Sequence, residues 1–176
     1  MYRTMRKDTV FSGRFLKVTT EKRKSDVLER VHVRDGVCVL PFTRENKIRV
    51  IVQHELDGKL RTKLVSGYVE DSEDPLTCAK RELREELGLT AKEWAELSRS
   101  FSEEYAVQKT QHYFIARGLR EEAEAPLRDE RIENYLDLTF DEMTRKVLSG
   151  EFGSTATAFT LLKLLYPASV SNGKTQ

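Results

Sequence analysis

The first third of the chain alternates apolar and polar positions in a way that predicts several short strands. Residues 9–18 and 27–33 alternate with a period of two, as half-exposed strands do. Residues 36–42 form a continuous apolar run, which is typical of a strand buried on both faces. After a turn, residues 48–52 are expected to return as the hairpin partner of this run. Residues 59–64 predict one more short strand.

The best-marked element is a helix over residues 75–87. Asp74 suits the N-cap, Pro75 the first helical position, and Gly88 the exit from the helix. At about 100° per residue, an apolar stripe faces the core and comprises Leu76, Ala79, Leu83 and Leu87.

Beyond this helix the pattern predicts further strands. Residues 101–105 and 111–118 read as two strands with a loop between them. The charged segment 119–134 contains a proline and predicts a long mobile loop. Residues 132–138 then predict a final strand.

Two helices are expected to close the chain. Thr139 and Glu142 have the spacing of a capping box and begin a helix that stops at Gly150. Residues 154–166 predict an amphipathic last helix. Because strands and helices are mixed and many strands are hairpin-like neighbours, the pattern favours an α+β fold or a helix–sheet–helix sandwich over a doubly wound parallel sheet.

Composition narrows the class of protein. The 176 residues fit one domain with an appended arm, and 30 basic residues balance 29 acidic ones. This near neutrality argues against bulk electrostatic binding to nucleic acid or to an anionic membrane. There is no apolar signal segment and no run long enough to span a membrane, so a soluble cytoplasmic protein is expected. Cys38 and Cys78 are read as reduced, packed thiols rather than as a catalytic thiol.

Three carboxylates share one side of the predicted helix. Glu82, Glu85 and Glu86 fall within about 100° of one another, beside the apolar stripe. Hard oxygen ligands at this spacing suit Mg²⁺ or Mn²⁺. Helix physics alone favours the alternative, a solvated face whose partners are Arg81 and Arg84.

The spacing of residues before and along the helix favours metal binding over a solvated face. Gly67, Glu73 and the run from Arg81 to Leu89 match every defined position of the Nudix box, so the chain resembles a Nudix hydrolase. The resemblance implies an α/β/α sandwich with a mixed sheet, and metal ligation by Glu82, Glu85 and Glu86 together with the carbonyl of Ser66. It also implies that Glu73 and Arg81 brace the loop against the helix.

The resemblance implies a reaction as well. Nudix hydrolases cleave a nucleoside diphosphate linked to a further group X, by attack of a metal-activated water on phosphorus. The layout is closest to the ADP-ribose and ADP-sugar pyrophosphatases. It implies an N-terminal antiparallel β arm over residues 1–34 that pairs in a homodimer, a Nudix domain over 35–167, and a flexible tail over 168–176. Glu130, in the charged loop before the last strand, is the candidate general base, with Asp129 or Glu133 as its rival.

Several residues bear on the substrate. Gln53 is a candidate substrate residue, but the arginine that usually follows this glutamine in the branch is absent here. Arg30 or Arg34 is expected to supply the missing positive charge. Tyr105 lies where dinucleoside polyphosphate hydrolases tend to carry a tyrosine, and Tyr105 and Phe101 are candidates to stack a nucleobase. Two alternatives therefore stay open, a dinucleoside polyphosphate hydrolase and a nucleotide sensor without activity.

Overall fold

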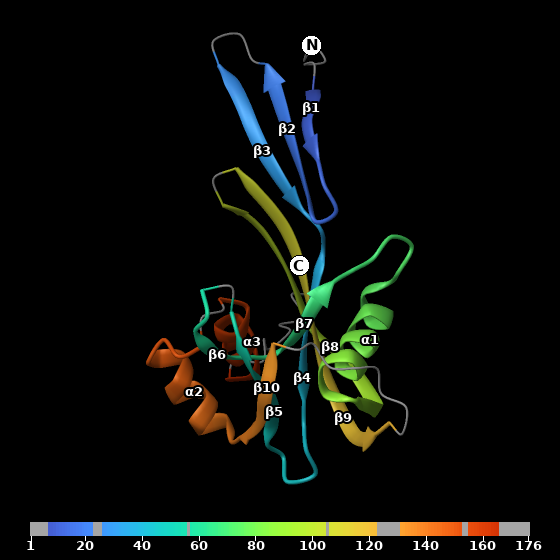
Figure 1. The fold of residues 1–176 in the computed structure, drawn as a ribbon, viewed down its shortest axis with the longest axis vertical. Helices are drawn as coiled ribbons and strands as arrows, with labels where there is room; N and C mark the ends of the chain where they lie inside the picture. Colours follow the sequence, from blue (N-terminus) through green and yellow to red (C-terminus); the bar gives the residue numbers. More distant parts are fainter. Residues whose placement is uncertain are drawn as a thin grey trace, which may run out of the picture.

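The computed structural model describes residues 7–22, 26–55, 57–104, 106–122, 131–152 and 155–165. Ten strands and three helices lie in these segments (Figure 1). The strands are β1 (Lys7–Ser12), β2 (Leu16–Lys22), β3 (Val27–Val33), β4 (Gly36–Pro41), β5 (Ile48–His54), β6 (Leu60–Lys63), β7 (Val65–Tyr68), β8 (Leu89–Glu104), β9 (Val107–Glu121) and β10 (Ile132–Leu138). The helices are α1 (Pro75–Leu87), α2 (Phe140–Leu148) and α3 (Thr155–Leu165).

The strands form two sheets. The larger has the order β1-β2-β3-β9-β4-β7, with β8 paired to β9, and the smaller has the order β10-β5-β6. Strand β9 runs parallel to both β3 and β4, whereas the other pairs are antiparallel. The larger sheet is therefore mixed, as the resemblance to Nudix hydrolases implied.

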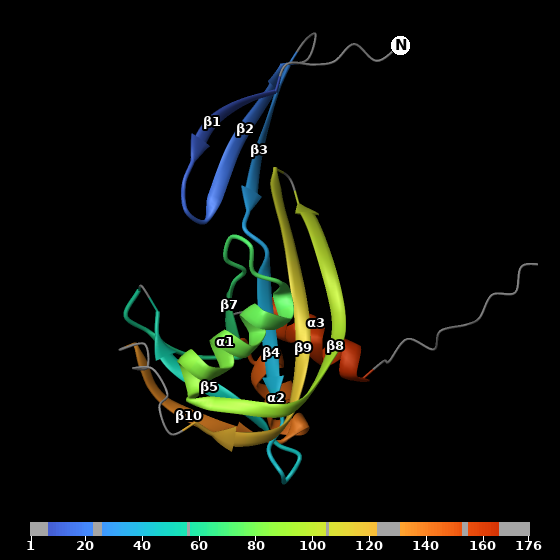
Figure 2. The same ribbon diagram turned by 90° about the vertical axis from the view of Figure 1, so that its right-hand side faces the viewer.

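An antiparallel arm extends from the body of the molecule. Strands β1, β2 and β3 form it, and Figures 1 and 2 show it projecting beyond the helices at one end of the long axis. The arm joins the body through β3, where Val31 and His32 pair with Val107 and Gln108 at the start of β9. The predicted antiparallel arm is therefore present.

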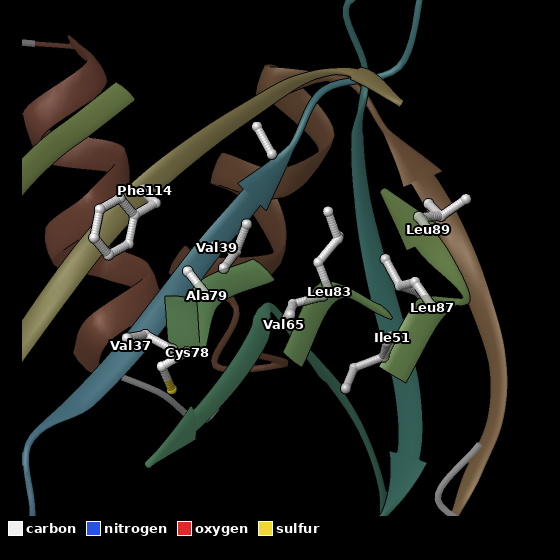
Figure 3. Packing of buried hydrophobic residues seen from close by; sticks show 11 residues of the cluster. Val37, Val39, Ile51, Val65, Cys78, Ala79, Leu83, Leu87, Leu89 and Phe114 are labelled. Carbon is white, nitrogen blue, oxygen red and sulfur yellow. The ribbon is translucent and has the colours of Figure 1, made fainter. Parts of the chain in front are cut away.

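Two hydrophobic clusters give the molecule its sandwich architecture. The first contains the α1 residues Cys78, Ala79, Leu83 and Leu87, and Figure 3 shows them gathered with Val37, Val39, Ile51, Val65, Leu89 and Phe114. The second packs α2 and α3 against alternate residues of the same strands, among them Cys38, Leu40 and Tyr113. Because successive strand residues point to opposite faces, helices cover both sides of the sheet. The expected α/β/α layering is confirmed.

Several predictions about the strands were wrong. Residues 9–18 are split between β1 and β2, and residues 107–110, which were expected in a loop, begin β9. Residues 48–52 do not form a hairpin with residues 36–42, because β4 lies between β9 and β7 and β5 belongs to the smaller sheet. A single bridge, Phe42 to Ile48, remains between the two runs. Residues 89–100, for which no strand was predicted, belong to the long strand β8, and residues 119–121 end β9 rather than beginning a loop. The rest of that loop, residues 123–130, and the tail 168–176 lie outside the described residues.

Candidate active site

Helix α1 is fixed at both ends by the residues that the sequence marks. The Asp74 carboxylate accepts hydrogen bonds from the backbone N–H groups of Leu76 and Thr77, at 3.0 and 3.1 Å. Gly88 ends the helix in the left-handed conformation, with φ of 65°, and its N–H donates to the carbonyl of Arg84. Glycine is favoured there because a Cβ disfavours this conformation. The three helix carboxylates are thereby held at a fixed place beside β7.

Gly67 allows the strand and the helix to approach closely. It lies in β7, and a Cβ built on it would overlap the carboxylate and the Cγ of Glu82. Any side chain at this position would therefore displace Glu82. The structure thus gives a steric reason for the glycine that opens the motif.

Arg81 binds the carboxylates on both sides of it. Its Nε and Nη2 donate to the two carboxylate oxygens of Glu73, at 3.0 and 3.1 Å. Its Nη1 donates to Glu82 at 2.7 Å and to Glu85 at 3.1 Å. Nη2 also donates to the carbonyl of Tyr68, at 3.1 Å. One guanidinium thus ties the loop, the end of β7 and the acidic face of α1 together.

The pKa values differ within this cluster. The hydrogen bonds from Arg81 hold the pKa of Glu73 below its ordinary value of 4.5. Burial raises the pKa of Glu82, and the adjacent Arg81 only partly offsets this effect. The Glu82 side chain is 12 % exposed. A buried carboxylate whose ionised form lacks solvation favours the approach of a cation.

Glu86 contacts β7 at Ser66. Its Oε2 accepts a hydrogen bond from the N–H of Ser66, at 3.0 Å. Ser66 pairs with Cys38 of β4, yet its N–H is turned to Glu86. In an antiparallel ladder the N–H and C=O of one residue point to the same side, so the Ser66 carbonyl faces Glu86 too.

The donor set fits a divalent ion such as Mg²⁺ or Mn²⁺. Within the described segments, no three acidic, cysteine or histidine side chains are already gathered around one point. Instead, the Nη1 group of Arg81 lies between Glu82 and Glu85 and supplies the positive charge there. The oxygen atoms of Glu82, Glu85 and Glu86, with the Ser66 carbonyl, are the hard ligands that these ions prefer.

Two cavities adjoin at Gly67 and Tyr68. One, of about 640 Å³, is lined by Glu86 and Ser66 and reaches Gln53, Lys63, Lys109, Gln111 and Arg131. The other, of about 360 Å³, is lined by Arg81, Glu82, Glu85 and Arg34. The acidic face of α1 therefore borders both, and the larger has room for a ligand of nucleotide size.

The predicted substrate residues are only partly brought together. Gln53, which is 4 % exposed, lines the larger cavity. Arg34 lines the smaller one and forms an ion pair with Asp71 at 2.8 Å. Arg30 instead pairs with Glu21 and Glu103, and Phe101 is 62 % exposed on β8. Neither residue lines the two cavities.

The remaining candidates have different outcomes. Tyr105, Glu130 and Asp129 lie outside the described residues. Glu133 forms an ion pair with His54, at 3.0 Å between Nε2 and Oε2. Sequence reasoning missed Lys109 and Gln111, which lie two residues apart on one face of β9. The sequence does contain a signal for these two residues. They are polar residues spaced two apart in a strand, just before a buried apolar run.

Comparison with known proteins agrees with this geometry. The model of the NUDIX domain matches residues 32–152, so the chain belongs to the Nudix family. It is 30 % identical over 149 residues to a methanol dehydrogenase activator of Bacillus methanolicus, covering 80 % of each chain. It is 26 % identical over 166 residues to an ADP-ribose pyrophosphatase of Bacillus subtilis (strain 168), covering 90 % of each.

Solved structures share the fold. An ADP compounds hydrolase superposes with a TM-score of 0.76 at 18 % identity, over 92 % of this chain and 91 % of that one. A Nudix hydrolase from Nitrosomonas europaea superposes with a TM-score of 0.64 at 12 % identity, over 76 % and 89 %. No described helix is long and apolar enough to cross a membrane.

Proposed function

We propose that this protein hydrolyses the pyrophosphate bond of a nucleoside diphosphate linked to a group X, with an ADP-ribose-like or ADP-sugar-like compound as the substrate. The observation that carries the proposal is the complete acidic face of α1, which borders both cavities. The products would be a nucleoside monophosphate and a phosphorylated X. A relative that is an ADP-ribose pyrophosphatase and a structural neighbour that is an ADP compounds hydrolase support this choice of substrate.

Different side chains have different proposed roles in metal binding and catalysis. Glu82, Glu85 and Glu86 would hold Mg²⁺ or Mn²⁺, which supplies charge neutralisation for the phosphates and acidifies a bound water. Glu73 holds Arg81 through two hydrogen bonds, and Arg81 in turn orients Glu82 and Glu85. The Ser66 N–H fixes the rotamer of Glu86. Glu130 remains the candidate to accept the proton of the attacking water.

The test is a product analysis with a variant that keeps the local hydrogen bond. In Glu86→Gln the amide oxygen can still accept from Ser66 N–H, so the fold is kept while one ligand charge is lost. ADP-ribose, ADP-glucose, UDP-glucose, NADH and diadenosine tetraphosphate are incubated with Mg²⁺ and resolved by ion exchange. We expect AMP plus a sugar phosphate from the wild-type protein and a loss of at least about 100-fold in the variant. Full activity in Glu86→Gln would refute the metal site.

Two other outcomes separate the alternatives. Cleavage of the dinucleoside polyphosphate alone would identify the other substrate class. If the wild-type protein binds metal and nucleotide but cleaves nothing in the panel, the proposed substrate class is wrong, which leaves a nucleotide sensor or a substrate outside the panel.

We also propose that the arm makes a homodimer. Large apolar side chains stand exposed on it, including Val10 at 65 % and Phe11 at 53 %. Exposed apolar surface of this kind marks an interaction site. Sedimentation equilibrium at micromolar concentration should give twice the mass of one chain, and a monomer there would refute the dimer.

A further inference from the structure

Lys109 is a cationic residue of the larger cavity to which the motif gives no role. It lies near the start of β9, where Lys109, Gln111 and Tyr113 share one face because strand residues alternate. Lys109 and Gln111 line the 640 Å³ cavity and also two adjoining recesses of about 240 and 90 Å³. Lys109 therefore stands where the cavity beside Glu86 continues toward α3.

The ammonium group of Lys109 has no carboxylate partner within the described part of the chain. Its Nζ lies 5.9 Å from the centroid of the Tyr68 ring. The neighbouring Lys63, by contrast, forms an ion pair with Glu55 at 3.3 Å. Burial lowers the pKa of Lys109, and no carboxylate counters that effect.

A half-buried charge without a counter-ion is unfavourable in the free protein. Taking an ammonium group out of water costs free energy unless a hydrogen-bonded anion compensates. Two carboxylates line the same cavity. Glu55 pairs with Lys63 at 3.3 Å, and Glu86 accepts a hydrogen bond from the N–H of Ser66. A ligand phosphate would supply the opposite charge, and an anion bound to a metal ion at Glu86 would lie in this same cavity, which Glu86 lines.

We propose that Lys109 binds a non-bridging phosphate oxygen of the substrate, opposite the metal-binding face of α1. This inference rests on the proposed function. It differs from the expectation that Arg30 or Arg34 compensates for the arginine absent after Gln53. Arg30 lines neither cavity, and Arg34 lines the smaller one.

The experiment compares three variants. Lys109→Met keeps an unbranched aliphatic side chain and removes the charge, and Lys109→Arg restores the charge. The matched control is Lys163→Met, because Lys163 also lies over an aromatic ring, with its Nζ 5.5 Å from the centroid of Phe159, but lines none of the three cavities. Each protein is assayed for ADP-ribose hydrolysis with Mg²⁺. Calorimetry measures the binding of inorganic pyrophosphate and of the non-hydrolysable α,β-methylene analogue of ADP-ribose, and thermal unfolding is measured without ligand.

We expect Lys109→Met to bind both probes at least about tenfold more weakly and to lose kcat/KM by a similar factor. Its melting temperature without ligand should be unchanged or higher, because a poorly solvated charge has been removed. If Lys109 only stabilised the fold, Lys109→Met would lower the melting temperature and leave the binding of both probes unchanged. Lys109→Arg should recover most of the binding, and Lys163→Met should match the wild-type protein.

The outcomes separate the two proposals. If wild-type protein binds the analogue but cleaves no substrate, the hydrolase proposal fails while the binding of Lys109→Met still decides the role of Lys109. Unchanged affinity of Lys109→Met for both probes overturns the inference even if hydrolysis is confirmed. Equal losses in Lys109→Met and Lys163→Met overturn it too, as does a wild-type protein that binds neither probe.

Discussion

Removal of the Arg81 guanidinium should expose how strongly the acidic face of α1 depends on one cation. The perturbation is Arg81→Gln, which keeps a polar side chain of medium length but loses the charge. It leaves Glu73 and Glu82, each 12 % exposed, without their ion-pair partner, and it leaves Glu85 next to two other carboxylates.

The magnitude follows from the burial of the pairs. Breaking a buried ion pair by removing one partner costs about 3–5 kcal/mol. Because Arg81 is itself 22 % exposed, we take the lower end, about 3 kcal/mol. For a chain of this length that corresponds to a fall in melting temperature of roughly 6–12 °C. The pKa of Glu73 is held below 4.5 by Arg81, so this stabilisation is present at neutral pH and is lost as the pH falls through the folded-state pKa.

The assay is thermal unfolding in EDTA and in Mg²⁺, with Arg84→Gln as the control. Arg84 lies on the same helix, is 46 % exposed and reaches Glu122 only at 3.9 Å, so its loss should cost less than about 1 kcal/mol. Mg²⁺ should restore part of the stability of Arg81→Gln, since cation binding at Glu82 and Glu85 replaces the lost charge. If Arg81→Gln is no less stable than Arg84→Gln in EDTA, the reasoning is refuted.

Two further predictions concern the scaffold around the site. Leu83→Ala empties a fully buried position between α1 and the sheet and should cost about 2–5 kcal/mol by chemical denaturation, and a loss under about 1 kcal/mol would contradict the packing described. Asp137→Asn removes a bidentate pair with Arg49, at 2.7 Å for both bonds, and should cost about 1–3 kcal/mol at pH 7. Because Arg49 holds the pKa of Asp137 below 3.8, this contribution disappears as the pH falls through the folded-state pKa, so a deficit independent of pH would count against it.

The sequence predicted best where local chemistry decides the structure. Asp74, Pro75 and Gly88 marked the bounds of α1, and Thr139 with Glu142 marked the start of α2, where both bonds of the capping box form. In these places the deciding contacts lie within four residues of one another. A helix cap or an apolar helical stripe can therefore be predicted without knowledge of the rest of the fold.

The pairing of strands that are distant in the sequence could not be predicted from local patterns. The turn after β4 predicts a hairpin, yet β4 pairs with β9 in a parallel register that places Gly36 opposite Gln111. Nothing local specifies that partner, because a buried apolar strand presents equivalent surfaces to several neighbours. The first part of β8 was missed for a related reason, since its charged residues break the alternation over residues 89–100.

The site depends on both kinds of information. The carboxylates come from one helix and are visible in the sequence, whereas Gln53, Ser66 and Lys109 come from β5, β7 and β9 and meet only in the folded chain. Glu73 shows why the motif extends so far beyond the ligands. Its two hydrogen bonds hold the Nε edge of Arg81, which leaves Nη1 as the group that contacts Glu82 and Glu85. A cation that displaces Nη1 therefore need not release Arg81 from the loop, so the acidic face can exchange one positive charge for another without losing its anchor.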